Sequence, residues 1–135
     1  HKNLKMKTIK IIIEKSNDGF FWAYAENVEG LTGGGETVQD AKQDILDGIE
    51  TMKSFDKKPK ILDGDYELVY KFDTQSLLKY YKGILSNPAL EKITGINQKL
   101  IHQYSTGLKK PRPAQRKKIE NGIHEFAKEL LAIEL

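Results

Sequence analysis

Residues 90–111 read LEKITGINQKLIHQYSTGLKKP, and this stretch decides how the second half of the chain is organised. Apolar residues repeat at helical spacing on both sides of Gly95. A glycine between two short helices can adopt the positive φ that a tight turn needs. The stretch therefore predicts two helices joined by a turn at Gly95, with apolar faces made by Leu90, Ile93, Ile101 and Tyr104.

The second of these helices, expected at about residues 97–105, carries side chains that suit the major groove of DNA. Its first turn can be capped by Asn97. Amide side chains recognise the edges of adenine, and lysine recognises those of guanine. The candidates for base recognition are Asn97, Gln98, Lys99 and Gln103.

Positive charges follow this helix directly, where phosphates flank a helix inserted in the groove. We expect Gly107 to end the helix in a left-handed conformation. The candidates for phosphate contacts are His102, Lys109, Lys110, Arg112 and Arg116.

The charge of the two halves agrees with a polyanionic partner for the second. Residues 71–135 hold twelve lysines and arginines against six acidic residues, a net charge of +6. Residues 1–70 hold ten lysines against thirteen acidic residues, a net charge of −3. A strongly basic half suggests nucleic-acid binding. The alternative is a small helical bundle with a solvated basic face.

Helical spacing continues on both sides of the quoted stretch. One helix is expected from about Asp73 to just before Asn87-Pro88. After Pro111 the apolar residues fit one long helix or two short ones, and Gly122 leaves both open. The apolar positions from Phe126 to Leu135 exceed what so small a domain needs to bury, so we assign dimerisation to them, as a homodimer or higher homo-oligomer.

The first half has a different pattern. Strands are expected at residues 6–15 and 20–26, with a short third strand around 34–36. The apolar spacing from Val38, after the capping residue Thr37, predicts a helix over 38–53. A loop over 55–65 and a strand over 66–72 complete the order β-β-β-α-β.

Composition excludes several classes of function. The chain has no cysteine, so disulfides, thiolate zinc sites and cysteine nucleophiles are excluded. We expect no metal, no cofactor and no catalytic residues, because Gly33-Gly34-Gly35 lacks the lysine of a phosphate-binding loop and no Ser/His/Asp set is visible. The longest apolar run is three isoleucines, so a cytoplasmic protein without membrane contact is expected. Residues 1–5 (HKNLK), which precede Met6, are interpreted as a candidate cloning remnant.

The stretch around Gly95 resembles the lambda-repressor-like (Xre/Cro-type) helix-turn-helix family. The residues that carry the resemblance are Leu90, Ile93, Thr94-Gly95-Ile96, Ile101, Tyr104, Gly107 and Pro111. In that family the start of the third helix recognises bases, which maps to Gln98, Lys99 and Gln103. The family usually has a small residue where this chain has Glu91, so a wider crossing of the two helices is expected.

The first half, followed by such a motif, resembles a HicB-type antitoxin. The residues that carry this are Gly19-Phe20-Phe21, Ala25 to Gly30, and Gly35-Glu36-Thr37 leading into Ala41. The resemblance implies an α+β fold class, with an N-terminal β-β-β-α-β partial RNase H-like domain followed by an all-α helix-turn-helix domain. The implied division is 1–65 for toxin binding, 66–73 for the last strand of that domain, and 74–135 for DNA binding and dimerisation.

The implied function is that of an antitoxin in a HicAB-type system. Such a protein binds and neutralises a small basic ribonuclease toxin of HicA type and represses its own operon by binding the operator DNA. The candidate toxin contacts are Glu26, Glu29, Gly34 and Glu36, each of which could equally be an ordinary surface acid or turn glycine. The alternatives are a one-component transcriptional regulator whose first domain senses a small ligand, and a nuclease of RNase H type, for which no convergent carboxylates are apparent.

Overall fold

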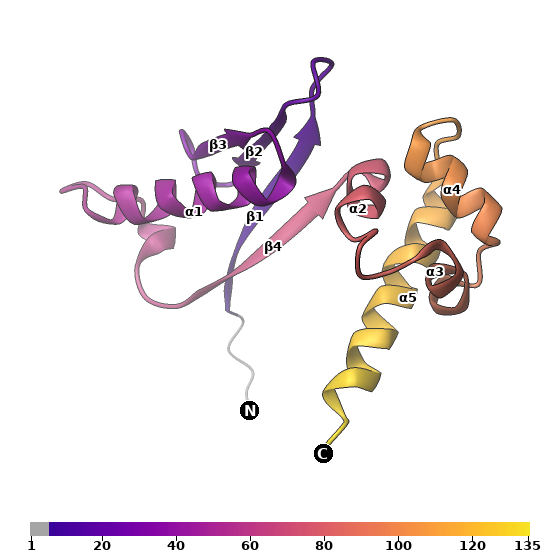
Figure 1. Ribbon diagram of the computed structural model, residues 1–135. Helices are drawn as coiled ribbons and strands as arrows, with labels where there is room; N and C mark the ends of the chain where they lie inside the picture. Colours follow the sequence, from indigo (N-terminus) through magenta and orange to yellow (C-terminus); the bar gives the residue numbers. More distant parts are fainter. Residues whose placement is uncertain (1–5) are drawn as a thin grey trace. The chain divides into compact units, whose positions relative to one another are not determined.

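The computed structural model describes residues 6–135 (Figure 1). The interpretation of residues 1–5 as a cloning remnant lies outside the described residues. The chain divides into two compact units, the first ending at Asp73 and the second running from Thr74 to Leu135.

The first unit is built on one four-stranded sheet with the strand order β3-β2-β1-β4. The pairs β1–β2 and β2–β3 are antiparallel, whereas β1 and β4 are parallel. Between β3 and β4 the chain forms helix α1 and a short 3-10 helix, η1. The bounds are β1 Lys7–Lys15, β2 Phe21–Ala25, β3 Thr32–Gly35, α1 Val38–Lys53, η1 Lys60–Leu62 and β4 Tyr66–Phe72.

Helix α1 packs on one face of this sheet and closes the core of the unit. It begins after Thr37, whose hydroxyl accepts a hydrogen bond from Asp40 N at 3.0 Å. Its apolar stripe is buried together with the inward-facing residues of β1 and β2. A methyl group built on Gly33 of β3 would lie 2.6 Å from Ile45 N, so α1 rests directly on the backbone of β3. The helix expected over 38–53 is confirmed.

The observed arrangement corrects the expected fold class, a β-β-β-α-β partial RNase H-like domain followed by an all-α helix-turn-helix domain. The structure is α+β with a four-stranded mixed sheet and five α-helices in residues 6–135, and its strands both precede and interleave with the helices. The reason lies in β4, which pairs in parallel with β1 from Lys7↔Tyr66 to Ile13↔Phe72. A parallel pair needs a crossover, so a helix stands between the strands. Periodicity alone does not give this pairing.

The second unit consists of four helices around a small apolar core. Their bounds are α2 Thr74–Tyr80, α3 Asn87–Thr94, α4 Gln98–Thr106 and α5 Pro113–Leu131. The core residues are Leu78, Leu90, Ile96, Ile101, Tyr104 and Ile119. Helix α2 is shorter than expected, because the chain leaves the helix after Tyr80 and turns through Gly83 before α3 begins.

Helix α5 is continuous for 19 residues, so Gly122 does not divide it. A methyl group on Gly122 would lie 2.5 Å from Ile93 O, so α5 crosses the end of α3 in direct contact with its backbone. Gly122 therefore allows α5 to pack closely on α3 and does not break the helix. Although α5 is long, no helix within residues 6–135 is both long and apolar enough to cross a membrane.

Gly122→Ala tests this close crossing. The added methyl group has no space against the backbone of α3, and overpacking of this kind costs about 1–3 kcal/mol of the free energy of unfolding, even though alanine favours a helix over glycine. Gly83→Ala is the control, because a methyl group there meets nothing within 4 Å. Chemical denaturation should show a clear loss for Gly122→Ala and a change within about 0.5 kcal/mol for Gly83→Ala. Equal effects would contradict the crossing.

Candidate nucleic-acid interface

The turn between α3 and α4 is built around Gly95 and Thr94. Gly95 ends α3 with a φ of +76°, and its N–H donates to Glu91 O at 2.8 Å. The Thr94 hydroxyl, which is buried, donates to Leu90 O at 2.7 Å and accepts from Ile96 N at 3.1 Å. The turn therefore holds its polar groups in hydrogen bonds and fixes the direction in which α4 leaves it.

The first turn of α4 is capped from two places. Asn97 Oδ1 accepts a hydrogen bond from Lys99 N at 2.8 Å. Glu91, which lies on α3 and is half-buried, accepts one from Gln98 N at 2.9 Å through Oε1. A carboxylate at a helix N-terminus is stabilised by the helix dipole and by the free N–H groups there. The Glu91 side chain therefore joins α3 to the start of α4.

Helix α4 presents an exposed polar side next to its buried one. Ile101 and Tyr104 are buried in the core of the second unit. The candidates for base recognition do not all share the same exposure, since Asn97, Gln98 and Lys99 are exposed whereas Gln103 is half-buried. The exposed candidates therefore gather at the first turn of α4, and His102 is exposed one turn further on.

Three of the phosphate candidates come together around one cavity. Lys109, Lys110 and Arg112 line an open cavity of about 580 Å³ between the end of α4 and the start of α5. Its other lining residues are Leu100, Tyr104 and Gln115, and Gln115 Nε2 donates to the Tyr104 hydroxyl at 3.4 Å. Helical spacing predicted Tyr104 only as a core residue and gave no signal for Gln115, although both line this cavity.

The remaining phosphate candidates lie outside the lining of this cavity. Arg116 is exposed on α5, and its Nη1 donates to Pro111 O at 3.2 Å, which fixes the loop before the helix.

Arg112 occupies the position before the first turn of α5 and makes no capping hydrogen bond with its side chain. The start of a helix carries a partial positive charge. The cavity thus combines three cationic side chains with a neighbouring helix N-terminus.

The candidate toxin contacts of the first unit are spread along β2, β3 and the segments that follow them. Glu26 and Glu29 are exposed between β2 and β3, and Glu36 is exposed between β3 and α1. Gly34 is already engaged, because its N–H donates to Asp44 Oδ2 at 2.9 Å and its α-carbon faces the rings of Phe20 and Trp22. The backbone N–H of Gly34 is therefore less available to a partner than the sequence suggested.

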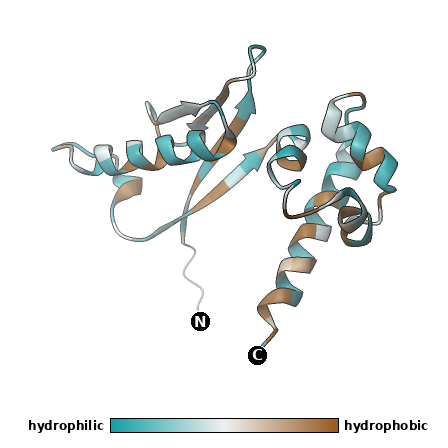
Figure 2. Ribbon diagram, in the orientation of Figure 1, coloured by the Kyte–Doolittle hydropathy of each residue, from teal (hydrophilic) through white to brown (hydrophobic). Residues whose placement is uncertain are grey.

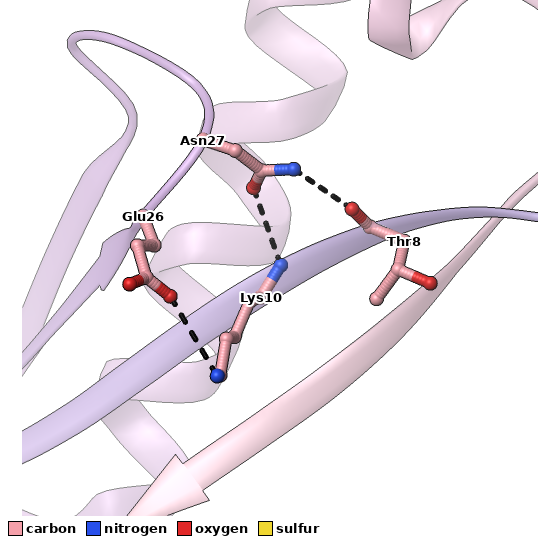
Figure 3. A network of polar contacts seen from close by, with 4 residues as sticks. All are labelled: Thr8, Lys10, Glu26 and Asn27. Carbon is pink, nitrogen blue, oxygen red and sulfur yellow. Dashed lines mark hydrogen bonds and ion pairs between the residues drawn. The ribbon is translucent and has the colours of Figure 1, made fainter.

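Glu26 belongs to a small polar network at the end of β2 (Figure 3). Its Oε2 lies 3.8 Å from Lys10 Nζ, in an exposed ion pair. The side chain of the neighbouring Asn27 forms two hydrogen bonds with the backbone of β1, on the side that pairs with β2. It donates to Thr8 O at 2.8 Å and accepts from Lys10 N at 3.3 Å. The side chain of Asn27 thus continues the pairing of β1 where β2 has ended.

On the face of the sheet opposite α1, aromatic side chains of β2 are partly exposed. Trp22 is 50% exposed and packs edge-to-face on Phe20 with 5.0 Å between the ring centroids. Tyr24 donates a hydrogen bond to Glu14 Oε1 at 3.0 Å, and this bond to the carboxylate raises the pKa of the tyrosine hydroxyl. Sequence alternation placed these rings on a strand but did not identify them as exposed.

We also searched the described residues for a metal site and compared the chain with known proteins. Within residues 6–135, no group of three or more histidine, aspartate or glutamate side chains is arranged to hold a metal ion. Comparison of the chain with protein-family models, with curated proteins and with solved structures gives no match.

Glu91→Ala tests the cap that joins α3 to α4. Loss of a capping acceptor costs about 1 kcal/mol of the free energy of unfolding, and the amide of Gln98 should exchange its hydrogen faster. Glu91→Gln retains an oxygen acceptor at the same position and should lose less on both measurements. Native-state hydrogen exchange followed by NMR gives the result, and unchanged exchange at Gln98 in the alanine variant would show that the cap does not form in solution.

Proposed function

We propose that this chain is a DNA-binding antitoxin of the HicAB type, which represses its own operon through the α3–α4 pair and neutralises a ribonuclease toxin through its first unit. The observation that carries the DNA-binding part is the joint placement of an exposed, doubly capped first turn of α4 and a cavity lined by three cationic side chains. The first feature suits base recognition and the second suits phosphate binding, which are the two kinds of contact that a DNA-binding protein makes.

Base recognition is assigned to the start of α4. Its exposed side chains at Gln98 and Lys99 can form hydrogen bonds with base edges in the major groove. Because Glu91 fixes the first backbone N–H of α4, the turn enters the groove with a set orientation. The Asn97 oxygen serves as a cap, which leaves its amide nitrogen for a base or phosphate.

Phosphate binding is assigned to the cavity at the start of α5. A phosphate of the DNA backbone carries one negative charge, and three cationic side chains around one opening can neutralise it and its neighbour. Tyr104 and Gln115 add hydrogen-bonding groups to the same lining. Contacts of this kind position the protein on the duplex without selecting a sequence.

Toxin binding is assigned to the first unit, on the strength of the sequence resemblance and of its charge. Glu26 and Glu29 are exposed in the turn between β2 and β3, and Glu36 is exposed at the other end of β3, beyond the Phe21↔Gly35 pair. Complementary charge speeds the encounter of an acidic surface with a basic partner. A protein with these two activities would work in the cytoplasm, where both the operator and the toxin are found.

Replacing both Lys109 and Lys110 by alanine tests the phosphate assignment. The double variant should bind DNA of any sequence more weakly, and the slope of log affinity against log salt should become shallower by about 2. The control is Lys79→Ala with Lys82→Ala, which removes the same charge from exposed positions at and after α2. Fluorescence anisotropy with the DNA upstream of the gene measures both. Equal salt slopes in the two double variants would contradict the assignment.

Gln98→Ala separates base recognition from general affinity. The variant should bind the preferred site more weakly, by about 1–3 kcal/mol, while its affinity for unrelated DNA stays the same. Thr106→Ala, at an exposed position at the end of α4, is the control and should keep the preference. Competition binding with specific and unrelated duplexes measures the ratio. A preference that survives Gln98→Ala unchanged would remove this residue from the recognition face.

The toxin assignment is tested with the protein encoded beside this chain. Glu29→Lys with Glu36→Lys should slow its association by about tenfold. Asp56→Lys with Asp65→Lys makes the same change of charge in the exposed loop before β4 and should have a smaller effect. Stopped-flow or surface-based kinetics measures the rates. Failure of the two proteins to associate at all, with a small-ligand effect on DNA affinity instead, would favour a one-component regulator.

A further inference from the structure

Trp22 is held in a defined position on the face of the sheet opposite α1, although it is 50% exposed. A methyl group built on Gly34 of β3 would lie 3.0 Å from both Cε3 and Cζ3 of this tryptophan, so the six-membered ring of the indole occupies the space of a side chain at Gly34. Phe20 packs edge-to-face against the same indole. Figure 2 shows β3 in pale colours, as expected for a strand in which three of the four residues are glycine. The indole thus rests on backbone and keeps part of its surface open to solvent.

A carboxylate stands directly beside this indole. In the pairing of β1 with β2, Glu14 lies opposite Trp22, so the two side chains point to the same face of the sheet. The β-carbons of such a pair are about 4.5–5.5 Å apart. Glu14 is exposed, and its charge can therefore act on a partner that contacts the indole.

Tyr24 holds this carboxylate in place. Its hydroxyl donates to Glu14 Oε1 at 3.0 Å across the two strands, and Oε2 is the oxygen that remains for a partner. The same bond is the main reason why the pKa of the hydroxyl is raised, and the negative charges of Glu14 and Glu26 add to it. The hydroxyl therefore stays protonated and continues to donate.

We propose that Trp22 and Glu14 form a binding site for an arginine side chain of a basic protein partner. The guanidinium group stacks on the open surface of the indole and forms hydrogen bonds with the Glu14 carboxylate. Arginine fits this pair of residues because its guanidinium group is planar, stacks on aromatic rings and pairs with carboxylates through several N–H groups. The ammonium group of lysine is a compact charge that is more strongly hydrated.

Charge favours a cationic occupant over a nucleic acid on this face. Aromatic side chains can also stack with the bases of a single strand, but surfaces that do so carry positive charge for the phosphates. Here the residue opposite Trp22 is acidic, and Lys10 is paired with Glu26 at 3.8 Å. Lys71, which is exposed on β4, is separated from the aromatic strand by β1. The net charge of −3 over residues 1–70 points the same way.

This inference deepens the proposed function: the identity of the partner rests on that function, whereas the chemistry of the site does not. Exposed glutamates alone mainly speed the encounter with a basic protein. Tryptophan and arginine are among the residues that contribute most to the affinity of protein interfaces. The site therefore adds a short-range anchor to the acidic surface of the first unit.

A short peptide serves as the probe of the site. It has four arginines and blocked termini, and its counterpart has four lysines and the same charge. Because the chain has one tryptophan, the indole N–H resonance reports on this site alone. We expect the arginine peptide to shift this resonance and to bind about fivefold more tightly than the lysine peptide.

Variants of the full chain identify the residues that bind the peptide, by fluorescence anisotropy of a labelled copy. Trp22→Leu should weaken binding of the arginine peptide about fivefold, and Glu14→Gln about threefold. The matched controls are Phe55→Leu, at an aromatic side chain that is 51% exposed, and Glu67→Gln, at an exposed carboxylate on β4. Both controls should bind the peptide as the native chain does. The circular dichroism of all four should stay native, because each side chain is exposed.

The protein encoded beside this chain tests the identity of the partner. Trp22→Leu combined with Glu14→Gln should raise the dissociation constant of that complex about tenfold, mainly through faster dissociation. Phe55→Leu combined with Glu67→Gln should leave it unchanged. Surface-based kinetics measures both.

Three results would overturn the inference. The first is equal binding of the arginine and lysine peptides, or equal losses in the variants and their controls. The second is a single-stranded oligothymidylate that shifts the indole resonance at lower concentrations than the arginine peptide does, which would assign this face to nucleic acid. The third is a complex with the neighbouring protein that Trp22→Leu with Glu14→Gln does not weaken, which would reject the site and leave the proposed function standing. Arginine binding at Trp22 without any association of the neighbouring protein would reject the proposed function and leave the site standing.

Discussion

Each compact unit depends on a helix that lies directly against backbone atoms at a position without a side chain. In the first unit, Gly33 of β3 lies beneath the backbone of Ile45 in α1. In the second, Gly122 of α5 lies against the carbonyl of Ile93 in α3. Close contact of this kind allows dense packing over a short stretch of chain, and it makes the two glycines intolerant of any added carbon. The orientation of the helices follows from these contacts.

The candidate DNA-binding surface is a consequence of the contact at Gly122. Because α5 holds the end of α3, the turn at Gly95 and the cap from Glu91 are held as well, and they set the start of α4. The beginning of α5 also brings Lys109, Lys110 and Arg112 to one cavity. Packing, capping and charge thus act on the same short segment and give the surface a fixed geometry.

Local patterns in the sequence predicted much of the secondary structure but not the way in which it is assembled. The stripe from Val38 predicted α1, and the residues around Gly95 predicted the turn, since both depend on nearby residues alone. The parallel pairing of β1 with β4 joins residues far apart in the sequence and left no local signal, so the expected fold class was wrong. The roles of Glu91 and Gly122 were also not predicted, because each is defined by a neighbouring helix.

We propose that the chain binds DNA with the start of α4 and the cavity before α5. Chemical-shift mapping tests it most directly: the labelled chain is titrated with duplex DNA from upstream of its gene, and backbone amides are recorded. We expect the largest changes at Gln98, Lys99, Lys109 and Lys110, with little change in β1 to β4. Changes confined to the first unit, or no changes at DNA concentrations that saturate comparable proteins, would contradict it.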